Sequence, residues 1–293
     1  MKILLLGPDG QLGYELRPLL SALGEVRTLS RTELDMKDLG ALRDVLARER
    51  PRVIVNATAY NEVDKAETDM DDALAINRDA VLAMGEYAKR DGAAFVHYST
   101  DFVFDGTKGA PYVEVDRTNP LSAYGRSKLA GEQALAGIQA PAIVLRTAWV
   151  YSLRRKSFVS MIHRLAREKK ELRIVRDQIG SPTFCRDLAR ASAVLVARLG
   201  KNPGEKAAEL RGIYHAAGEG ACSRYELATA VVELDPNRRE HTVESLEPAT
   251  TDAFPAPARR PGNAPLDCEK LSTTFNVRFL PWRLALAEAL RVP

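Results

Sequence analysis

The sequence predicts an α/β protein, with a doubly wound parallel sheet in its first half and a smaller α/β lobe after it. Short apolar runs alternate with amphipathic segments, which is typical of parallel strands joined by helices that cover both faces of a sheet. A loop with three regularly spaced glycines directly follows the first apolar run. The expected strands are residues 2–6, 26–30, 53–57, 94–99 and 142–151.

The second half has a less regular pattern, which predicts a boundary between a first domain, residues 1–151, and a second lobe, residues 152–293. Ser223 followed three residues later by Glu226 is typical of a capping box, so a helix is expected to begin there. The chain is expected to return to the first domain near residues 211–235. The other expected elements are helices at 157–169, 186–199, 223–234 and 282–291, a short strand at 212–217 and a loop at 248–265.

Composition excludes several classes of protein. The 293 residues are 45% hydrophobic and 28% charged, which suits a well-buried core rather than a disordered chain. The formal net charge is only +3 and basic residues are mixed with acidic ones, so neither nucleic acid nor a membrane is an expected partner. The three cysteines lack metal-ligand spacing, and no signal peptide or membrane-spanning run is recognisable. We therefore expect a soluble, cytoplasmic protein.

The glycine loop predicts a dinucleotide site. Gly7, Gly10 and Gly13 lie between a strand and an amphipathic segment, which is the context of a dinucleotide-binding fingerprint. Glycines let the backbone approach a pyrophosphate, and the helix N-terminus supplies N–H donors to it. Residues 1–151 are thus interpreted as a Rossmann-type NAD(P)-binding domain, although a simple tight turn is the alternative reading of the loop. Pro18 is expected to kink the following helix or end it early.

The end of the second predicted strand indicates which cofactor is used. Ser30 and Arg31 stand where NAD-specific enzymes place an acid. A hydroxyl and a guanidinium suit the 2′-phosphate of NADPH, so NADPH is the expected cofactor and NADH the alternative; Arg31 could also simply face solvent. The remaining expected cofactor contacts are Gln11, Leu12, Asp35, Met36, Ala57, Thr58, Ala59, Tyr60 and Asn77.

Tyr124 and Lys128 are the expected catalytic pair, because residues four apart on a helix share one face, roughly 6 Å apart along the axis. A lysine and a cationic nicotinamide ring both favour the phenolate, so Tyr124 can exchange a proton with a carbonyl oxygen while hydride arrives at carbon. By itself this spacing also occurs by chance. Thr100 follows a predicted strand and is expected to hydrogen-bond the same carbonyl, or else to cap a turn. His97 is interpreted as a core residue.

The order of these features resembles the extended short-chain dehydrogenases/reductases, and within them the dTDP-4-dehydrorhamnose reductases. The resemblance covers nearly the whole chain. It rests on the glycine loop, the Tyr124/Lys128 pair and several longer segments. These segments are GPDGQLGYEL at 7–16, VIVNATAYNEVDKAE at 53–67, HYSTDFVFDG at 97–106, RTAWVY at 146–151, RDQIGSPT at 176–183, GIYHAAGEGACSRYELA at 212–228 and RRPGNAPLD at 259–267.

The resemblance implies an enzyme that reduces the C4 carbonyl of dTDP-4-dehydro-L-rhamnose to dTDP-L-rhamnose with NADPH, a step in nucleotide-sugar and cell-surface polysaccharide biosynthesis. It implies that Tyr124 donates the proton and that Lys128 holds the nicotinamide ribose. It also implies that Thr100 and Asp101 contact the hexose and that Trp149 lines the sugar pocket. A core aromatic on a buried strand is the alternative interpretation of Trp149.

Two departures from the family pattern matter. Members of the family can be dimers bridged by magnesium through acidic side chains; Glu15 is present here, but Arg186 stands where a second acid is expected. We therefore expect no metal site and a monomer or weak homodimer. The segment around Arg260, a further expected substrate contact, lacks a serine of the family pattern.

Two other functions are compatible with the sequence. One is a reductase or epimerase of another nucleotide-linked keto sugar, which needs the same catalytic residues. The other is a non-catalytic dinucleotide-binding regulatory subunit, since a relative of the family has that role. The joint presence of Thr100, Tyr124 and Lys128 argues against the second alternative.

Overall fold

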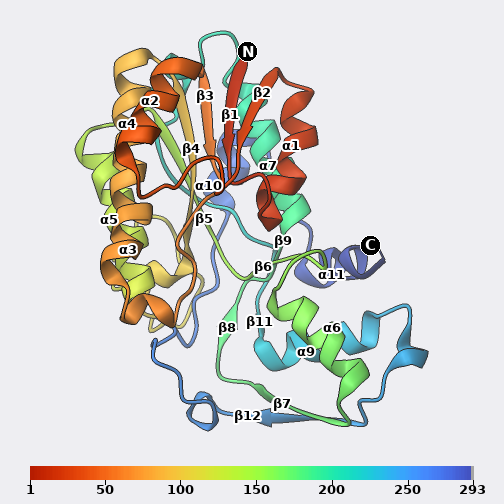
Figure 1. Ribbon diagram of the computed structural model, residues 1–293. Coiled ribbons are helices and arrows are strands. Elements are labelled where there is room, and N and C mark those ends of the chain that lie inside the picture. The colour runs from red at the N-terminus through yellow and green to blue at the C-terminus, as the bar shows by residue number, and fades with distance from the viewer. Residues whose placement is uncertain (292–293) are drawn as a thin grey trace.

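A six-stranded parallel sheet forms the upper half of the molecule in Figure 1, which shows the computed structural model; the structure describes residues 1–291. The strand order is β10-β5-β4-β3-β1-β2, so β1 lies between β2 and β3. The predicted doubly wound sheet is therefore confirmed. Its strands are Lys2–Leu6 (β1), Glu25–Leu29 (β2), Val53–Asn56 (β3), Ala94–Thr100 (β4), Ala142–Thr147 (β5) and Gly212–His215 (β10).

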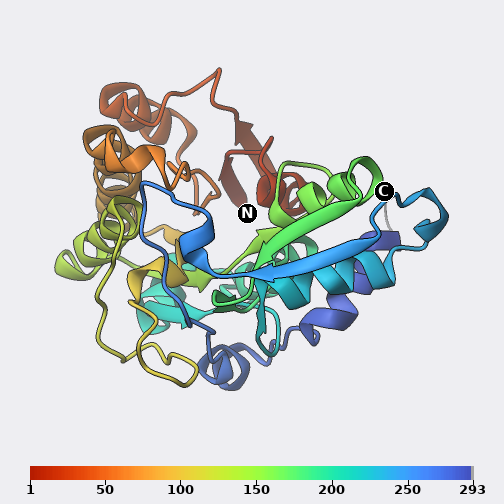
Figure 2. The ribbon, with the colours of Figure 1, turned by 90° about the horizontal axis from the view of Figure 1, so that it is seen from below.

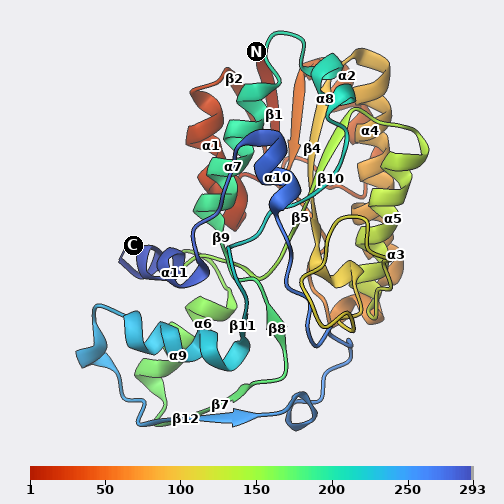
Figure 3. The ribbon, with the colours of Figure 1, turned by 180° about the vertical axis from the view of Figure 1, so that it is seen from behind.

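Helices cover both faces of this sheet (Figures 1 and 3). One face is covered by α2 (Leu39–Glu49), α4 (Ala80–Asp91) and α5 (Ala123–Gly137). The other is covered by α1 (Gln11–Ser21) and α7 (Cys185–Arg198), which pack against each other, and by α8 (Pro203–Glu209) and α10 (Glu269–Phe275). The short α3 (Met70–Leu74) and a π-helical turn (Ala75–Asp79) precede α4.

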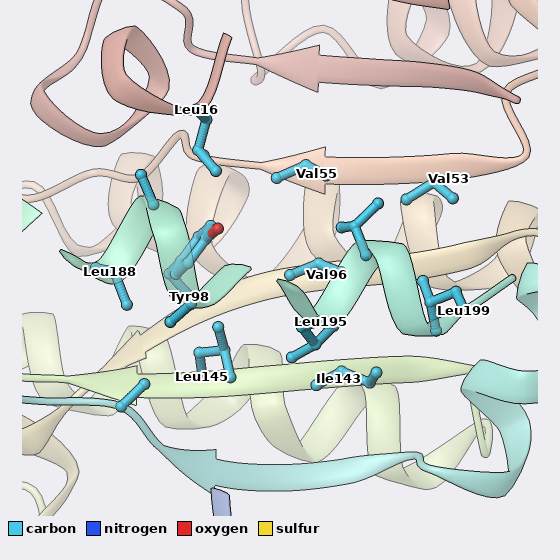
Figure 4. Close-up of a cluster of buried hydrophobic side chains, with 14 of the residues drawn as sticks. Leu16, Val53, Val55, Val96, Tyr98, Ile143, Leu145, Leu188, Leu195 and Leu199 are labelled. Atoms are coloured by element: carbon cyan, nitrogen blue, oxygen red, sulfur yellow. The ribbon is translucent and has the colours of Figure 1, made fainter. Parts of the chain in front are cut away.

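The core explains why the central strands read as continuous apolar runs. Every residue of β3 and β4 is buried, as expected for parallel strands covered on both faces. Figure 4 shows one of these two faces, where Val55, Val96 and Leu145 of the strands meet Leu188 and Leu195 of α7.

The lower lobe has its own hydrophobic core, which includes Ile162, Leu227 and Leu286. Its helices are α6 (Phe158–Glu168), α9 (Arg224–Leu234) and α11 (Trp282–Arg291), close to the predicted bounds. The predicted capping box of Ser223 and Glu226 is confirmed. The strand β7 (Glu171–Val175) pairs with β12 (Ser245–Ala249), which lies along the lower edge in Figure 1 and crosses the middle of the view in Figure 2. The other pairs are β8 (Ile179–Gly180) with β11 (Cys222–Ser223) and β6 (Val150–Tyr151) with β9 (Thr183–Phe184).

Two local predictions are wrong, and one of the two alternatives at Pro18 is excluded. Helix α1 does not end early at Pro18 but continues to Ser21, because Pro18 removes only one hydrogen bond near the end of the helix while Leu16 and Leu20 anchor it in the core. The predicted strand at 142–151 ends at Thr147, because Trp149 adopts a left-handed backbone conformation with φ of 46° that interrupts pairing. The expected loop at 248–265 begins with the last two residues of β12.

Within residues 1–291, none of the helices has the length and apolar character that crossing a membrane requires.

Candidate functional site

The glycine loop lies beside the carboxyl ends of β1 and β3. At β1 the order in which strands are added to the sheet reverses, because β2 lies on one side of β1 and β3 on the other. Gly7 has φ of 78°, a conformation that favours glycine, and a Cβ on Gly13 would collide with the carbonyl oxygen of Gly7. A Cβ on Gly7 would lie 3.0 Å from Thr58 Cγ2 and 3.1 Å from the Ala57 carbonyl oxygen. Doubly wound folds hold dinucleotides at this switch point of the parallel sheet.

Helix α1 begins directly after Gly10, so its first N–H groups face this loop. Gln11 is held by a residue from the second half of the chain, since its Oε1 accepts a hydrogen bond of 2.9 Å from Ser152 Oγ. Leu12 is half-buried and packs against the core. The loop is therefore braced by residues from both halves of the chain.

An acid missed in the sequence occupies the end of β2. The Glu33 carboxylate accepts hydrogen bonds from the Ser30 backbone N–H at 2.9 Å and from Ser30 Oγ at 2.8 Å, and these bonds lower the pKa of Glu33. Arg31 is exposed. The sequence did contain a signal for this contact, because Glu33 follows Ser30 by three residues and so falls in the same turn. A 2′-phosphate at Ser30 would have to displace Glu33, whereas Arg31 is free to move toward it.

The other expected cofactor residues are in different environments. Met36 is only 7% exposed and packs in the core, while Asp35 is exposed and accepts a hydrogen bond from the Lys37 backbone. Ala59 is exposed at the end of the segment that follows β3. Of these residues, Ala59 and Asp35 are accessible to a ligand without rearrangement.

Asn77 fixes the backbone of Tyr60 rather than facing solvent. Its Oδ1 accepts from the Tyr60 N–H at 3.0 Å, and its Nδ2 donates to the Tyr60 carbonyl at 3.0 Å and to Ser127 Oγ at 2.9 Å. Every donor of this buried amide is thus used within the protein. Asn77 ties the segment after β3 to α5, the helix that carries Tyr124.

Tyr124 and Lys128 both lie on α5, which begins at Ala123 after the N-cap Ser122. Tyr124 is half-buried as a residue and packs edge-on to Phe102, with ring centroids 5.6 Å apart. Burial raises the pKa of Tyr124 to about 12; the Thr100 hydroxyl lowers it and the Asp101 carboxylate raises it further. The phenol is therefore protonated at neutral pH, as a proton donor must be.

Lys128 makes its polar contacts with β4. Its Nζ donates to the Tyr98 carbonyl oxygen at 2.6 Å and lies 3.3 Å from His97 Nε2. Burial lowers the pKa of Lys128 to about 8. The expected direct effect of the Lys128 charge on the Tyr124 phenol is consequently not found in this structure.

His97 is more than a core histidine, because it connects Lys128 to β3. Its Nδ1 lies 3.3 Å from Asn56 Nδ2, and Asn56 Oδ1 accepts from the Thr58 N–H at 3.0 Å. Burial, followed by the charge of Lys128, holds the pKa of His97 well below its usual range, so the ring is neutral. Asn56 was missed in the sequence, although a polar residue at the end of an apolar strand was a usable signal.

Thr100 and Asp101 follow β4 directly and both are buried. The Thr100 hydroxyl accepts from the Phe102 N–H at 3.2 Å and donates to Asp101 Oδ1 at 3.1 Å, so it caps a short turn as well as facing Tyr124. Burial raises the pKa of Asp101 to about 7, although the Thr100 hydrogen bond and Arg224 oppose this. Asp101 can therefore exchange a proton near neutral pH.

Trp149 lies in the turn between β5 and β6 and is half-buried, not a fully enclosed core aromatic. The Arg224 guanidinium carbon lies 3.5 Å from the centroid of its ring. A Cβ on Gly180 would lie 2.6 Å from Trp149 Cε2 and 2.8 Å from Nε1 and Cζ2, nearer than any other atom. Trp149 therefore contacts Gly180 of β8 and Arg224 of α9.

Arg260, the expected substrate contact, is paired with Asp64. Its Nη2 lies 2.7 Å from Asp64 Oδ2, and this hydrogen bond lowers the pKa of the carboxyl. The two side chains are 27% and 44% exposed, so the pair is accessible to solvent. It links the segment after β3 to the loop that precedes α10.

Arg186 pairs with Glu15 of the same chain, with Nε 3.0 Å from Oε2. This contact joins α7 to α1 at the residues that the sequence analysis compared with the family's metal bridge between subunits. No cluster of three or more metal-ligating His, Cys, Asp or Glu side chains occurs within residues 1–291.

Comparison with known proteins identifies the family. The family model described as the RmlD substrate binding domain matches residues 1–292. The dTDP-4-dehydrorhamnose reductase of Burkholderia thailandensis is 41% identical over 296 residues, which cover 99% of this chain and 98% of that protein. The enzyme of the same name from Escherichia coli K12 is 36% identical over 295 residues, or 99% of this chain and 97% of its own.

Solved structures agree with the sequence comparison. A dTDP-4-dehydrorhamnose reductase from Clostridium acetobutylicum has a TM-score of 0.89 at 34% identity, with 99% of both chains covered. The reductase from Bacillus anthracis, solved in complex with NADP, has a TM-score of 0.88 at 29% identity, covering 99% of this chain and 98% of that one. A UDP-glucose 4-epimerase from Thermus thermophilus, 19% identical, shares the fold alone. The chain belongs to the dTDP-4-dehydrorhamnose reductase family.

Proposed function

We propose that this protein reduces the C4 carbonyl of dTDP-4-dehydro-L-rhamnose with NADPH to give dTDP-L-rhamnose. The observation that supports this most directly is the meeting of Tyr124, Thr100 and Asp101 at the carboxyl end of β4, in a chain whose full-length relatives carry the reductase name. The protein is accordingly an oxidoreductase of nucleotide-sugar metabolism.

The residues of the glycine loop fit a dinucleotide. Gly7 and Gly13 leave space and conformational freedom that a Cβ would remove, and the N-terminus of α1 faces the loop. When bound, NADPH supplies the hydride. Arg31 is the proposed partner of the 2′-phosphate, and its exposure leaves its guanidinium accessible.

Tyr124 is the proposed proton donor, because its raised pKa keeps the phenol protonated until an alkoxide forms beside it. Thr100 is proposed to hydrogen-bond the same oxygen. Its hydroxyl proton now points at Asp101, so it must turn away from that carboxylate to reach a substrate. Protonation of Asp101, whose pKa is about 7, lowers the cost of this hydroxyl rotation, because a neutral carboxyl accepts the hydrogen bond less strongly than a carboxylate.

The organisation around the site completes the proposal. We propose a cofactor domain at 1–151 and a substrate lobe at 152–293, with the chain returning to the first domain near 211–235, where β10 joins the six-stranded sheet, and with α7, α8 and α10 also covering that sheet. Residues 292–293 lie outside the described residues. The enzyme is proposed to work in the cytoplasm as a monomer or weak homodimer without magnesium. The pairing of Arg186 with Glu15 supports the last point, since it neutralises a carboxylate that a bridging cation would need.

The test is a turnover panel. NADPH oxidation is followed with dTDP-4-dehydro-L-rhamnose and with 4-keto sugars linked to dTDP, UDP and GDP, with Tyr124→Phe as the inactive control. The proposal requires the highest kcat/KM on the dTDP-linked rhamnose precursor. A higher value on another sugar would reassign the substrate, and absence of turnover on every sugar would favour a non-catalytic dinucleotide-binding protein.

A further inference from the structure

Arg224 is a cation in the candidate site that the catalytic scheme does not use. It is the first residue of α9 in the lower lobe, and its guanidinium carbon lies 3.5 Å from the ring centroid of Trp149 and 4.8 Å from that of Phe158. Among residues 1–291, no side chain or carbonyl group accepts a hydrogen bond from its guanidinium, and no carboxylate lies within ion-pair distance of it. Its N–H donors are therefore available to a ligand.

The position of this guanidinium is fixed by its neighbours. Trp149 packs closely against Gly180 and against Arg224, and its backbone is in a left-handed conformation. An arginine stacked on an aromatic ring uses its flat face for that contact and leaves its donors free at the edge. Arg224 thus presents a rigid fork of N–H groups, already ordered before any ligand arrives.

The surrounding charges favour an anion at this point. Burial lowers the pKa of Arg224 to about 10; the Asp101 carboxylate opposes this shift and the nearby Arg260 adds to it, and the group remains charged at neutral pH. Arg260 is neutralised by its ion pair with Asp64, whereas Arg224 forms no direct ion pair among the described residues. The counter-charge near Arg224 is Asp101, which lies beyond ion-pair distance and whose raised pKa of about 7 leaves it partly protonated at neutral pH. A half-buried cation without a directly paired carboxylate is unfavourable, and an anionic ligand reduces that cost.

We propose that Arg224 binds the diphosphate of the nucleotide-sugar substrate and so anchors it between the two lobes. The inference rests on the proposed function, which supplies the substrate class. A planar guanidinium matches two phosphate oxygens at once, which a sugar hydroxyl cannot reproduce. Burial raises the pKa of Asp101 and the Arg224 charge opposes this shift, so the two residues are near each other. The proposed anion site therefore adjoins the residues around Tyr124.

Equilibrium binding tests this without turnover. Protein saturated with NADP⁺ is titrated with dTDP, UDP and thymidine by calorimetry. Arg224→Gln should weaken binding of both diphosphates roughly 10- to 100-fold, the range of a lost charge-assisted hydrogen bond, while the affinity for thymidine and for NADP⁺ stays unchanged. Arg224→Lys should recover part of the loss, because it keeps the charge but not the fork.

Controls separate binding from folding. Arg283→Gln removes an exposed arginine of the same lobe, paired with Glu233, and should leave diphosphate affinity unchanged. Arg224→Met keeps an apolar contact with Trp149 and should match Arg224→Gln; thermal unfolding checks each variant. Unchanged dTDP affinity in Arg224→Gln, or an equal loss for thymidine, would overturn the proposal. Failure of the turnover panel alone would count against the rhamnose substrate and not against Arg224.

Discussion

Replacement of Glu132 by alanine should destabilise the protein strongly. Arg146 on β5 and Glu132 on α5 form a two-pronged ion pair, with Nη2 2.6 Å from Oε2 and Nε 3.0 Å from Oε1. Both side chains are 2% exposed. The pair connects the helix that carries Tyr124 to the strand that leads to Trp149.

The magnitude follows from burial. Removal of one partner of a buried pair leaves the other charge uncompensated and costs about 3–5 kcal/mol. Arg146 Nη1 already has no hydrogen-bond acceptor among residues 1–291, so little else can compensate the guanidinium. At roughly 2–4 °C per kcal/mol for a chain approaching this size, Tm should fall by about 6–20 °C.

The assay is urea and thermal unfolding followed by circular dichroism. The matched control is Glu168→Ala, which breaks the Arg164–Glu168 pair on α6; these side chains are 61% and 46% exposed, so the loss should stay below about 0.5 kcal/mol. The double variant Glu132→Leu with Arg146→Met should recover much of the loss, because no charge is left buried. Equal losses in Glu132→Ala and Glu168→Ala would refute the reasoning.

Four further predictions address the site. Tyr124→Phe removes the transferable proton, so turnover should fall roughly 10²- to 10⁴-fold with NADPH affinity unchanged; turnover near wild type would remove Tyr124 from the chemistry. Arg31→Asp should lower the ratio of kcat/KM with NADPH to that with NADH by about tenfold or more, and an unchanged ratio would show that Arg31 faces solvent. EDTA should leave initial rates and sedimentation unchanged, because Arg186 would repel a cation at Glu15; activity lost on chelation and restored by Mg²⁺ would contradict this. Burial raises the pKa of Asp101 to about 7 from an ordinary 3.8, so its stabilising contribution is present below pH 3.8 and is lost as pH rises through 7. Asp101→Asn should flatten the pH dependence of urea unfolding in that window, and an unaltered profile would exclude the shift.

Much of the fold could be predicted because its signals are local. Parallel strands buried on both faces appear as apolar runs, and the capping box at Ser223 marks the start of α9. The break at Trp149 has no such signal, since an aromatic residue in a left-handed conformation is held there by Gly180 and Arg224 from other segments. At Pro18 a local signal was present, but it did not decide the structure. The proline disfavours the helix, and burial of the surrounding leucines outweighs that cost, so the helix does not end early.

The sequence predicted which residues form the site better than it predicted which groups those residues contact. Tyr124 and Lys128 share a helix as expected, because their spacing is local. The partners of Lys128 come from β4, and no spacing rule indicates that His97 and the Tyr98 carbonyl would meet its amine. Arg224 adjoins a recognised motif, but its stacking depends on packing between distant segments.

The hydrogen bonds that pass through His97 run in one direction. The Thr58 N–H donates to Asn56, and the Asn56 amide donates to His97 Nδ1, so the proton of the neutral ring lies on Nε2 and points at Lys128, which itself donates to the Tyr98 carbonyl. An amine can accept this bond and an ammonium cannot. Protonation of Lys128, with its pKa near 8, therefore removes the acceptor of the His97 N–H, and the His97 Nε2 resonance should shift across that pH. The Tyr98 carbonyl accepts from the amine and from the ammonium alike, so a single proton decides whether the strand holds this side chain by one hydrogen bond or by two.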